Sequence, residues 1–312
     1  MTDLIEITKF CQTDPSKGRV IALGFFDGVH LGHRKIISKT VEIAKKMDLT
    51  STVLTFENFK LKDDSVLTDI NERKELFRKL GVDQVVSIDF EDVREVSARS
   101  FIKDLLLSSL NAKVLVAGTD YTFGKGAEGN IDLLKESSCP DSFILEVVPD
   151  VIVDGQKCSS SLIRKLLLEG ETDKANILLG DERFSYSGTI VKGKMLGRTL
   201  GFPTANLPVS PDKFKAKFGV YMTLTTIEGR RYKSVSNLGL RPTVEDSDNV
   251  NIETYIYGLE DPGNEELYGK DIKVELMSFI REEKRFASVE DLRLQVESDK
   301  EKVANLWEMY NI

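Results

Sequence analysis

The stretch Val20–His33, VIALGFFDGVHLGH, decides the fold class of this chain of 312 residues. It begins with a short apolar run that is typical of a buried strand, and it passes through a turn rich in glycine. It then leads into Leu31–Met47, where apolar residues recur at helical spacing. Strand-like and helix-like runs go on alternating up to about residue 180. This alternation predicts a parallel sheet that is covered by helices on both faces.

The rest of this half follows the same pattern. The expected strands are 20–25, 51–56, 84–88, 113–117 and 143–148, and the expected helices are 31–47, 71–80 and 97–110. In such sheets ligands bind outside the carboxyl ends of the strands. The loops that follow Phe25 and Ala117 are therefore the places where we expect a site.

From about Phe184 the pattern changes to short β-rich segments at close spacing. The expected strands are 187–191, 220–226, 233–237, 252–257 and 272–280, and one helix runs from Val289 to about Tyr310 with Ser288 as its N-cap. Such spacing is typical of an antiparallel β-barrel or sandwich, here with a terminal helix. With Gly180–Arg183 as the linker, we expect an α/β domain over residues 1–182 and a β domain over 183–312.

Composition limits the classes of partner. Lys and Arg number 43 against 51 Asp and Glu, a net charge of −8, which disfavours a nucleic-acid partner because phosphate backbones need a basic surface. The three cysteines have no CxxC spacing, which suits a reducing compartment. The N-terminus does not read as a signal peptide, and no apolar stretch approaches the roughly 20 residues of a membrane span. We therefore expect a cytoplasmic enzyme with no membrane partner; the sequence leaves a homo-oligomer open.

Both histidines of the chain, His30 and His33, lie three residues apart in the first loop. A lone histidine near a helix is usually an exposed or internally bonded side chain. Here the spacing puts both rings on one helical face, at a helix N-terminus whose free N–H groups favour phosphate. Imidazoles aimed at one point can donate hydrogen bonds to a phosphorus centre as charge builds on its oxygens.

Further residues of the same loop fit phosphate binding. Gly24, Gly28 and Gly32 allow tight turning and close backbone approach. Asp27 either caps the turn or orients a cation or phosphate, and the structural role is slightly favoured. Three serines, Ser159–Ser161, precede an amphipathic helix that carries Arg164. They read first as a helix cap, and together with the guanidinium they also describe a triphosphate clamp.

These segments resemble the motifs of the HxGH nucleotidyltransferases. GFFDGVHLGH is similar to GxFDGxHxGH and SSSLIR to SSTxIR, while GTDYTFG at Gly118–Gly124, with Gly129 behind it, resembles a loop of bacterial FMN adenylyltransferases. The resemblance implies a Rossmann-like domain in which FMN phosphate attacks the α-phosphorus of ATP. The implied catalytic residues are His30, His33 and Arg164, with Gly24, Phe25, Asp27, Gly28, Gly32, Ser160 and Ser161 on the nucleotide and Asp120 and Phe123 bordering the flavin. The family's Pro-His-Pro element is absent, since Asn58-Phe59-Lys60 stands in its place.

The second half contains a dense cluster at Gly193–Asn206, GKMLGRTLGFPTAN. It reads either as a long surface loop or as a phosphate loop, because spaced glycines can wrap a phosphate with backbone N–H groups. It lacks the spacing of a Walker A loop. Thr204 and Asn206 alternate along an extended segment, so both can face one cation with the oxygen ligands that magnesium prefers.

This cluster resembles the GxxLGFPTAN motif of riboflavin kinases, and the resemblance continues in order to the terminal helix. The matching segments are Gly219–Tyr221, Ser236–Thr243, Ile252–Thr254, Leu267–Gly269 and Phe279–Arg281, with Lys284, Phe286 and Asp299. The resemblance implies that Thr204 and Asn206 hold Mg²⁺ and that Glu253 is the general base. Gly193, Gly201 and Pro203 would contact the nucleotide and Arg281 the flavin. Glu253 also reads as a polar member of an alternating strand, and Arg281 as a rim salt-bridge residue.

The two halves together resemble the bifunctional riboflavin kinase/FMN adenylyltransferase family, also called bacterial FAD synthetases. The implied reactions are phosphorylation of riboflavin to FMN and adenylylation of FMN to FAD with release of pyrophosphate. ATP would be the co-substrate of both, with Mg²⁺ as cofactor. Two alternatives stay open: a riboflavin kinase with a weakened adenylyltransferase half, and a flavin- or nucleotide-binding regulator without turnover.

Overall fold

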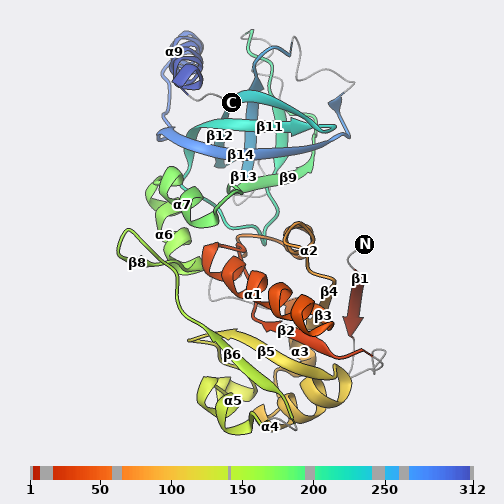
Figure 1. Cartoon of the computed structure of the whole chain (residues 1–312). Coiled ribbons are helices and arrows are strands. Elements are labelled where there is room, and N and C mark those ends of the chain that lie inside the picture. The colour runs from red at the N-terminus through yellow and green to blue at the C-terminus, as the bar shows by residue number, and fades with distance from the viewer. Residues whose placement is uncertain are drawn as a thin grey trace. The chain divides into compact units, whose positions relative to one another are not determined.

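The computed structural model describes residues 3–7, 17–57, 65–139, 142–193, 201–240, 250–259 and 267–309. Its internal contacts divide the chain into two compact units, Met1–Ser160 and Ser161–Ile312. Figure 1 shows a helix-covered sheet in the first unit and a barrel-like sheet in the second. The division falls ahead of the boundary at residue 182 that the sequence led us to expect, and that domain boundary stays a prediction.

The first unit is built on a six-stranded sheet in which every pairing is parallel. The strands are β1 (Asp3–Ile7), β2 (Arg19–Leu23), β3 (Thr50–Glu57), β4 (Gln84–Asp89), β5 (Ala112–Gly118) and β6 (Ile144–Val148), in the order β1-β4-β3-β2-β5-β6. A separate two-stranded ribbon joins β7 (Ile152–Val153) to β8 (Gln156–Lys157). The parallel sheet confirms the expected α/β fold, and β1 is an edge strand that the sequence did not predict.

Helices cover both faces of this sheet. Neighbouring residues of a strand point to opposite faces, so one strand contributes apolar side chains to both helix layers. Val20 and Ala22 of β2 pack with α1 (Leu31–Met47) and α2 (Ile70–Lys79), and Ile21 and Leu23 pack in a second cluster with residues 98–110. The remaining helices of the unit are α3 (Phe90–Val93), α4 (Ala98–Ser100), the 3₁₀ turn η2 (Lys125–Ala127) and α5 (Ile131–Ser137).

The expected single helix over 97–110 is wrong in one respect. Only α4 is α-helical, and η1 (Phe101–Ser109) is a π-helix. Its wider turns are visible in two hydroxyl bonds across five residues, from Ser108 to the Lys103 carbonyl and from Ser109 to the Asp104 carbonyl, each 2.8 Å long. The spacing of apolar residues does not distinguish an α-helix from a π-helix here, because either helix would bury the same side of the segment.

The second unit contains α6 (Ser160–Glu169), α7 (Thr172–Leu179) and a six-stranded antiparallel sheet. Its strands are β9 (Ser185–Thr189), β10 (Ala205–Pro208), β11 (Gly219–Ile227), β12 (Arg230–Leu240), β13 (Val250–Ile256) and β14 (Asp271–Arg281), in the order β10-β13-β12-β11-β14-β9. A bridge between Val191 and Asn206 joins the two outer strands, so the sheet nearly closes on itself. The expected barrel is confirmed.

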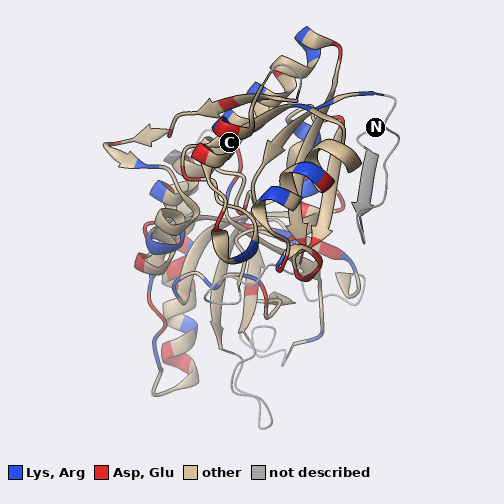
Figure 2. Cartoon of the chain, turned by 90° about the horizontal axis from the view of Figure 1, so that it is seen from below, with Lys and Arg blue, Asp and Glu red and all other residues tan. Residues whose placement is uncertain are grey.

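The terminal helix α9 (Val289–Met309) packs on this barrel, as the sequence predicts. Its buried Val303 and Trp307 meet Val220, Met222 and Leu224 of β11. Ser288 caps the helix, since its hydroxyl accepts from the Asp291 N–H at 3.1 Å. Figure 2 shows both basic and acidic residues on several of the helices. Within the described residues, no helix is long and apolar enough to cross a membrane.

Candidate functional sites

The loop between β2 and α1 has a strained backbone. Phe26, Gly28 and Val29 all have positive φ, at 57°, 80° and 40°. That region is disfavoured for a β-branched residue such as Val29, and such strain is concentrated at functional sites. Gly24 is needed for the same path, because a Cβ at this position would lie 2.9 Å from the ring of Phe26.

His30 is the N-cap of α1. Its Nδ1 accepts from the backbone N–H groups of Gly32 at 3.2 Å and His33 at 3.4 Å, so the proton of the neutral ring sits on Nε2. The side chain is 5% exposed, and burial lowers the pKa of His30 to about 4. The ring is therefore a neutral hydrogen-bond donor at pH 7.

The ring of His33 stacks on that of His30, with 3.6 Å between the ring centroids. Its Nδ1 is buried and has no hydrogen-bond partner among the residues that the structure describes. Burial lowers the pKa of His33 well below the usual range, and the neighbouring His30 and Arg73 lower it further. The two histidines thus form one stacked pair of neutral rings, whereas their spacing predicted only that they share a helical face.

A cavity of about 630 Å³ opens beside this pair, and we call it the aromatic cavity. It brings together five residues that the sequence singled out: Gly24, Phe25, His33, Asp120 and Phe123. The sequence analysis missed the other rings and the arginine that line it. These are Phe26, Phe56, Phe90, Phe101, Tyr121 and Arg94. Flat apolar walls with a polar end fit a ligand that carries an aromatic ring and a phosphate.

Asp27 lies behind the cavity and braces its loop. Its carboxylate accepts from the Thr68 N–H at 3.0 Å, and its carbonyl oxygen accepts from the Ser160 hydroxyl at 2.8 Å. Gly28 donates to the Thr68 hydroxyl at 2.8 Å. Several residues that the sequence singled out do not line the cavity, namely Asp27, Gly28, His30, Gly32 and Ser160. These contacts correspond to the structural role of Asp27.

Ser161 and Arg164 belong to the second compact unit, at the start of α6. The guanidinium carbon of Arg164 lies 5.6 Å from the ring centroid of Phe214 in that unit. Their part in a triphosphate clamp stays a prediction. Asn58, Phe59 and Lys60, which replace the family's Pro-His-Pro, lie outside the described residues.

A lysine that the sequence analysis missed neutralises carboxylates beside the aromatic cavity. Lys157 Nζ lies 2.7 Å from Asp120 Oδ2 and 3.0 Å from Asp150 Oδ1. The hydrogen bond from Lys157 keeps the pKa of Asp150 below its usual value. A phosphate approaching Asp120 therefore meets less negative charge than the carboxylates alone would present.

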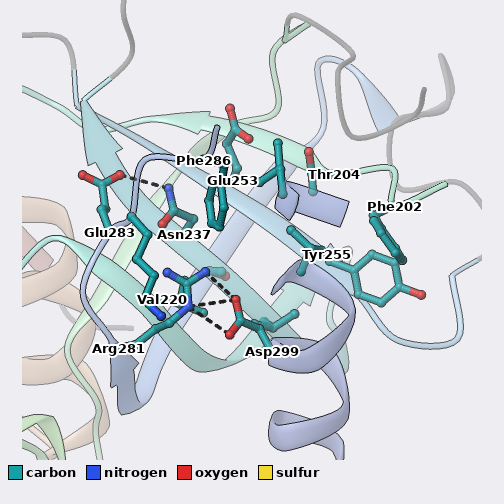
Figure 3. A pocket seen from close by; sticks show the side chains of 15 residues that line it. Phe202, Thr204, Val220, Asn237, Glu253, Tyr255, Arg281, Glu283, Phe286 and Asp299 are labelled. Atoms are coloured by element: carbon teal, nitrogen blue, oxygen red, sulfur yellow. Dashed lines mark hydrogen bonds and ion pairs between the residues drawn. The ribbon is translucent and has the colours of Figure 1, made fainter. Parts of the chain in front are cut away.

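The second unit has its own cavity, of about 300 Å³, which Figure 3 shows; we call it the barrel cavity. Three residues singled out from the sequence line it: Thr204, Glu253 and Arg281. Its apolar walls are Phe202, Val220, Val235, Tyr255, Phe286, Leu292 and Val296. Thr204 and Glu253 lie at one end, away from Arg281 and Asp299 in Figure 3.

Asn206 is held behind this cavity and does not line it. It lies directly opposite Glu253 in the β10–β13 pairing and is 7% exposed. Its Oδ1 accepts from Asn251 Nδ2 at 3.1 Å, and its Nδ2 donates to the Thr204 carbonyl at 3.3 Å. A Cβ on Gly193 would come within 2.5 Å of the Asn206 amide, so glycine leaves room for that side chain.

Arg281 forms a fork with Asp299 that joins β14 to α9. Its Nε lies 2.9 Å from Asp299 Oδ1, and its Nη2 lies 2.5 Å from Asp299 Oδ2. Gln295 donates to the same carboxylate at 3.0 Å. The guanidinium is thus part of the cavity wall, and its charge is already paired with that of Asp299.

The nucleotide-binding residues expected before Thr204 lie outside the barrel cavity. Gly201 is exposed with a φ of 79°, and Pro203 is half-buried. Lys194–Leu200 and Arg241 lie outside the described residues. At the cavity rim, Lys300 Nζ sits 4.4 Å and 4.1 Å from the ring centroids of Phe202 and Tyr255, a contact that the sequence did not indicate.

Comparison with known proteins assigns a family to each half. The FAD synthetase family matches residues 12–162, and the riboflavin kinase family matches residues 181–307. The chain is 35% identical over 293 residues to a protein of Listeria monocytogenes named bifunctional riboflavin kinase/FMN adenylyltransferase, covering 91% of this chain and 90% of that one. A protein of the same name from Bacillus subtilis is 33% identical, with 90% of each chain covered.

A solved structure shares the whole architecture. It comes from Streptococcus pneumoniae and is named a macrolide-efflux protein. The TM-score is 0.84 at 29% identity, with 97% of this chain and 99% of that chain covered. The likeness over nearly both full lengths extends to the parallel sheet and to the barrel.

Proposed function

The chain belongs to the bifunctional riboflavin kinase/FMN adenylyltransferase family, and we propose that each reaction takes place in the cavity of one unit. Riboflavin is phosphorylated to FMN in the barrel cavity, and FMN is adenylylated to FAD in the aromatic cavity. One observation carries this assignment. All residues that line the aromatic cavity lie within the FAD synthetase match, and all that line the barrel cavity lie within the riboflavin kinase match. We retain 1–182 and 183–312 as the domains, and a cytoplasmic location.

In the aromatic cavity, the FMN phosphate attacks the α-phosphorus of ATP and pyrophosphate leaves. The reaction needs no protein nucleophile, because positioning and stabilisation of charge carry this kind of transfer. His33 faces the cavity, and the stacked His30 holds its backbone through Nδ1. The neutral ring of His33 donates a hydrogen bond to the phosphate oxygens without first losing an ionic partner.

In the barrel cavity, the apolar walls receive the flavin ring and the polar end receives the ribityl chain. Glu253 accepts the proton of the 5′-hydroxyl as that oxygen attacks the γ-phosphorus of ATP, and ADP leaves. Thr204 lies at the same end of the cavity, which puts base and phosphate ligand together. Arg281, already bound to Asp299, supports the opposite wall.

The oxygen donors at that end of the cavity and directly behind it fit magnesium. The Thr204 hydroxyl and the Asn206 Oδ1 are hard oxygen donors, and an amide oxygen that accepts one hydrogen bond keeps a second lone pair. These two side chains would hold Mg²⁺, which supplies positive charge to the ATP phosphates when bound. Asn206 keeps its orientation through Asn251 and through its bond to the Thr204 carbonyl.

The two alternatives are not favoured. A kinase with a weakened first half and a regulator without turnover would each lack one or both of the two activities. Instead both family matches are present, and the relatives are named as bifunctional over about nine-tenths of the chain.

Two variants test the assignment by separating the reactions. Glu253→Gln should abolish FMN formation from riboflavin and spare FAD formation from supplied FMN, while His33→Ala should do the reverse. Glu283→Gln is the matched control, because Glu283 also lines the barrel cavity but contacts Asn237 at 3.3 Å. If Glu253→Gln made FMN as fast as this control, the assignment of the base would be wrong.

A further inference from the structure

A buried arginine lies next to the aromatic cavity without lining it. Arg73 of α2 is 3% exposed. Its Nη1 donates to the Phe25 carbonyl at 2.6 Å and to the Thr55 hydroxyl at 2.8 Å, and its Nη2 donates to the Phe56 carbonyl at 3.1 Å. One guanidinium thus connects two segments: the loop that follows β2 and the last residues of β3.

Stability alone gives a weak reason for a charge at this place. The charges of Asp27, Asp69, Glu57 and Glu72 act on Arg73 without any of these carboxylates being hydrogen-bonded to its guanidinium, and its buried Nε has no partner among the described residues. Burial lowers the pKa of Arg73 to about 10, so the group is charged at pH 7. A buried charge is costly, and replacing one by an apolar side chain is often neutral or stabilising. The three bonds therefore point to a role in positioning.

The groups that Arg73 holds belong to the wall of the aromatic cavity. Phe25 and Phe56 both line it, and the Arg73 guanidinium carbon lies 4.5 Å from the ring centroid of Phe25. Thr55 strengthens the same arrangement, because its hydroxyl donates to the Phe25 carbonyl at 2.9 Å. Arg73 fixes the backbone of both phenylalanines and the ring of one, so it limits how far the wall can shift.

We infer that Arg73 is a positioning residue that holds Phe25 and Phe56 as a preformed wall for the flat ring of a substrate. This inference rests on adenylylation in the aromatic cavity. Preformed walls spare a ligand the cost of ordering them, so their loss weakens binding more than it slows turnover of bound substrate. The ring is the flavin of FMN or the adenine of ATP, since each of them has a flat aromatic face.

The test compares Arg73→Lys with Arg78→Lys. Lysine keeps the charge, but its three N–H donors start from one nitrogen and do not span the acceptors that Nη1 and Nη2 of the guanidinium reach separately. Arg78 lies on the same helix and is exposed, which makes the same change there a matched control. For Arg73→Lys we expect the KM of either FMN or ATP to rise about tenfold with kcat within about threefold. The substrate whose KM rises identifies the ring.

Riboflavin phosphorylation is the internal control, since Arg73 lies outside the riboflavin kinase match. If Arg73→Lys unfolds the first unit, Thr55→Val decides, because it removes a hydroxyl from the same network and keeps the shape of the side chain. We expect Thr55→Val to raise the same KM about threefold.

Failure of this inference is distinct from failure of the proposed function. Wild-type protein that makes no FAD contradicts the function itself. Wild-type protein that makes FAD, with folded Arg73→Lys and Thr55→Val variants whose KM values equal those of Arg78→Lys, overturns the positioning role. A fall in kcat alone, with both KM values unchanged, overturns it as well.

Discussion

Protonation of His30 should make the first unit sensitive to acid by an amount that follows from its burial. The pKa of the folded side chain is about 4, against 6.5 for an exposed histidine. Between these two values the unfolded chain binds the extra proton, so the free energy of unfolding falls as the pH falls through this window. A difference of 2.5 units corresponds to about 3 kcal/mol, most of which is lost by pH 4.

His30→Asn removes this titration and keeps the helix cap. Asparagine is a good N-cap, because its side-chain oxygen accepts the same backbone N–H bonds that His30 Nδ1 accepts now. The variant should match the wild type in stability at pH 7 within about 1 kcal/mol. Between pH 7 and pH 4 it should lose about 3 kcal/mol less than the wild type does.

Urea unfolding at the two pH values measures this difference. Circular dichroism follows both units, while the fluorescence of Trp307, the single tryptophan, follows the second unit. With two histidines in the chain, an NMR titration of the ring protons gives the pKa of His30 directly, since His30→Asn leaves one signal. A midpoint near the ordinary value for His30, or equal acid sensitivity of variant and wild type, would refute the reasoning.

Three further predictions concern the second unit. Asp299→Asn should lower the stability of that unit by about 3 kcal/mol in urea followed by Trp307 fluorescence, because Arg281 would lose its ionic partner at a largely buried site; an unchanged midpoint would speak against it. Gly193→Ala should push on the Asn206 amide and raise the Mg²⁺ concentration for half-maximal FMN formation about fivefold, with FAD formation from FMN unchanged. Chelation of Mg²⁺ should stop FMN formation and allow recovery when the ion is returned; activity that persists in excess chelator would exclude the metal.

The sequence predicted the fold well where one physical signal dominated. Runs such as 114–117 are apolar on both sides because helices cover both faces of the sheet, and this pattern identifies buried parallel strands. Thr204 and Glu253 were singled out by the resemblance of their motifs, and the structure brings both to one cavity. β1 was missed because its five residues, Asp-Leu-Ile-Glu-Ile, form neither a continuous apolar run nor a strict alternation of apolar and polar residues.

The aromatic cavity could be predicted only in part. Its rings come from segments far apart in the chain, such as Phe56, Phe90 and Phe101, and nothing in their local spacing shows that they meet. Arg73 did leave a signal: it shares the buried face of α2 with Leu76 and Phe77, where helical spacing leads one to expect an apolar residue. A charged residue on such a stripe indicates a buried network.

Labelled ATP tests the central claim most directly. Purified protein is given riboflavin with ATP that carries its label on either the γ- or the α-phosphorus, and the flavin products are separated. Two cavities with two chemistries predict γ-label in both FMN and FAD, and α-label in FAD alone. FMN without any α-labelled FAD would contradict adenylyl transfer. The absence of labelled flavin with both forms of labelled ATP would contradict both assignments.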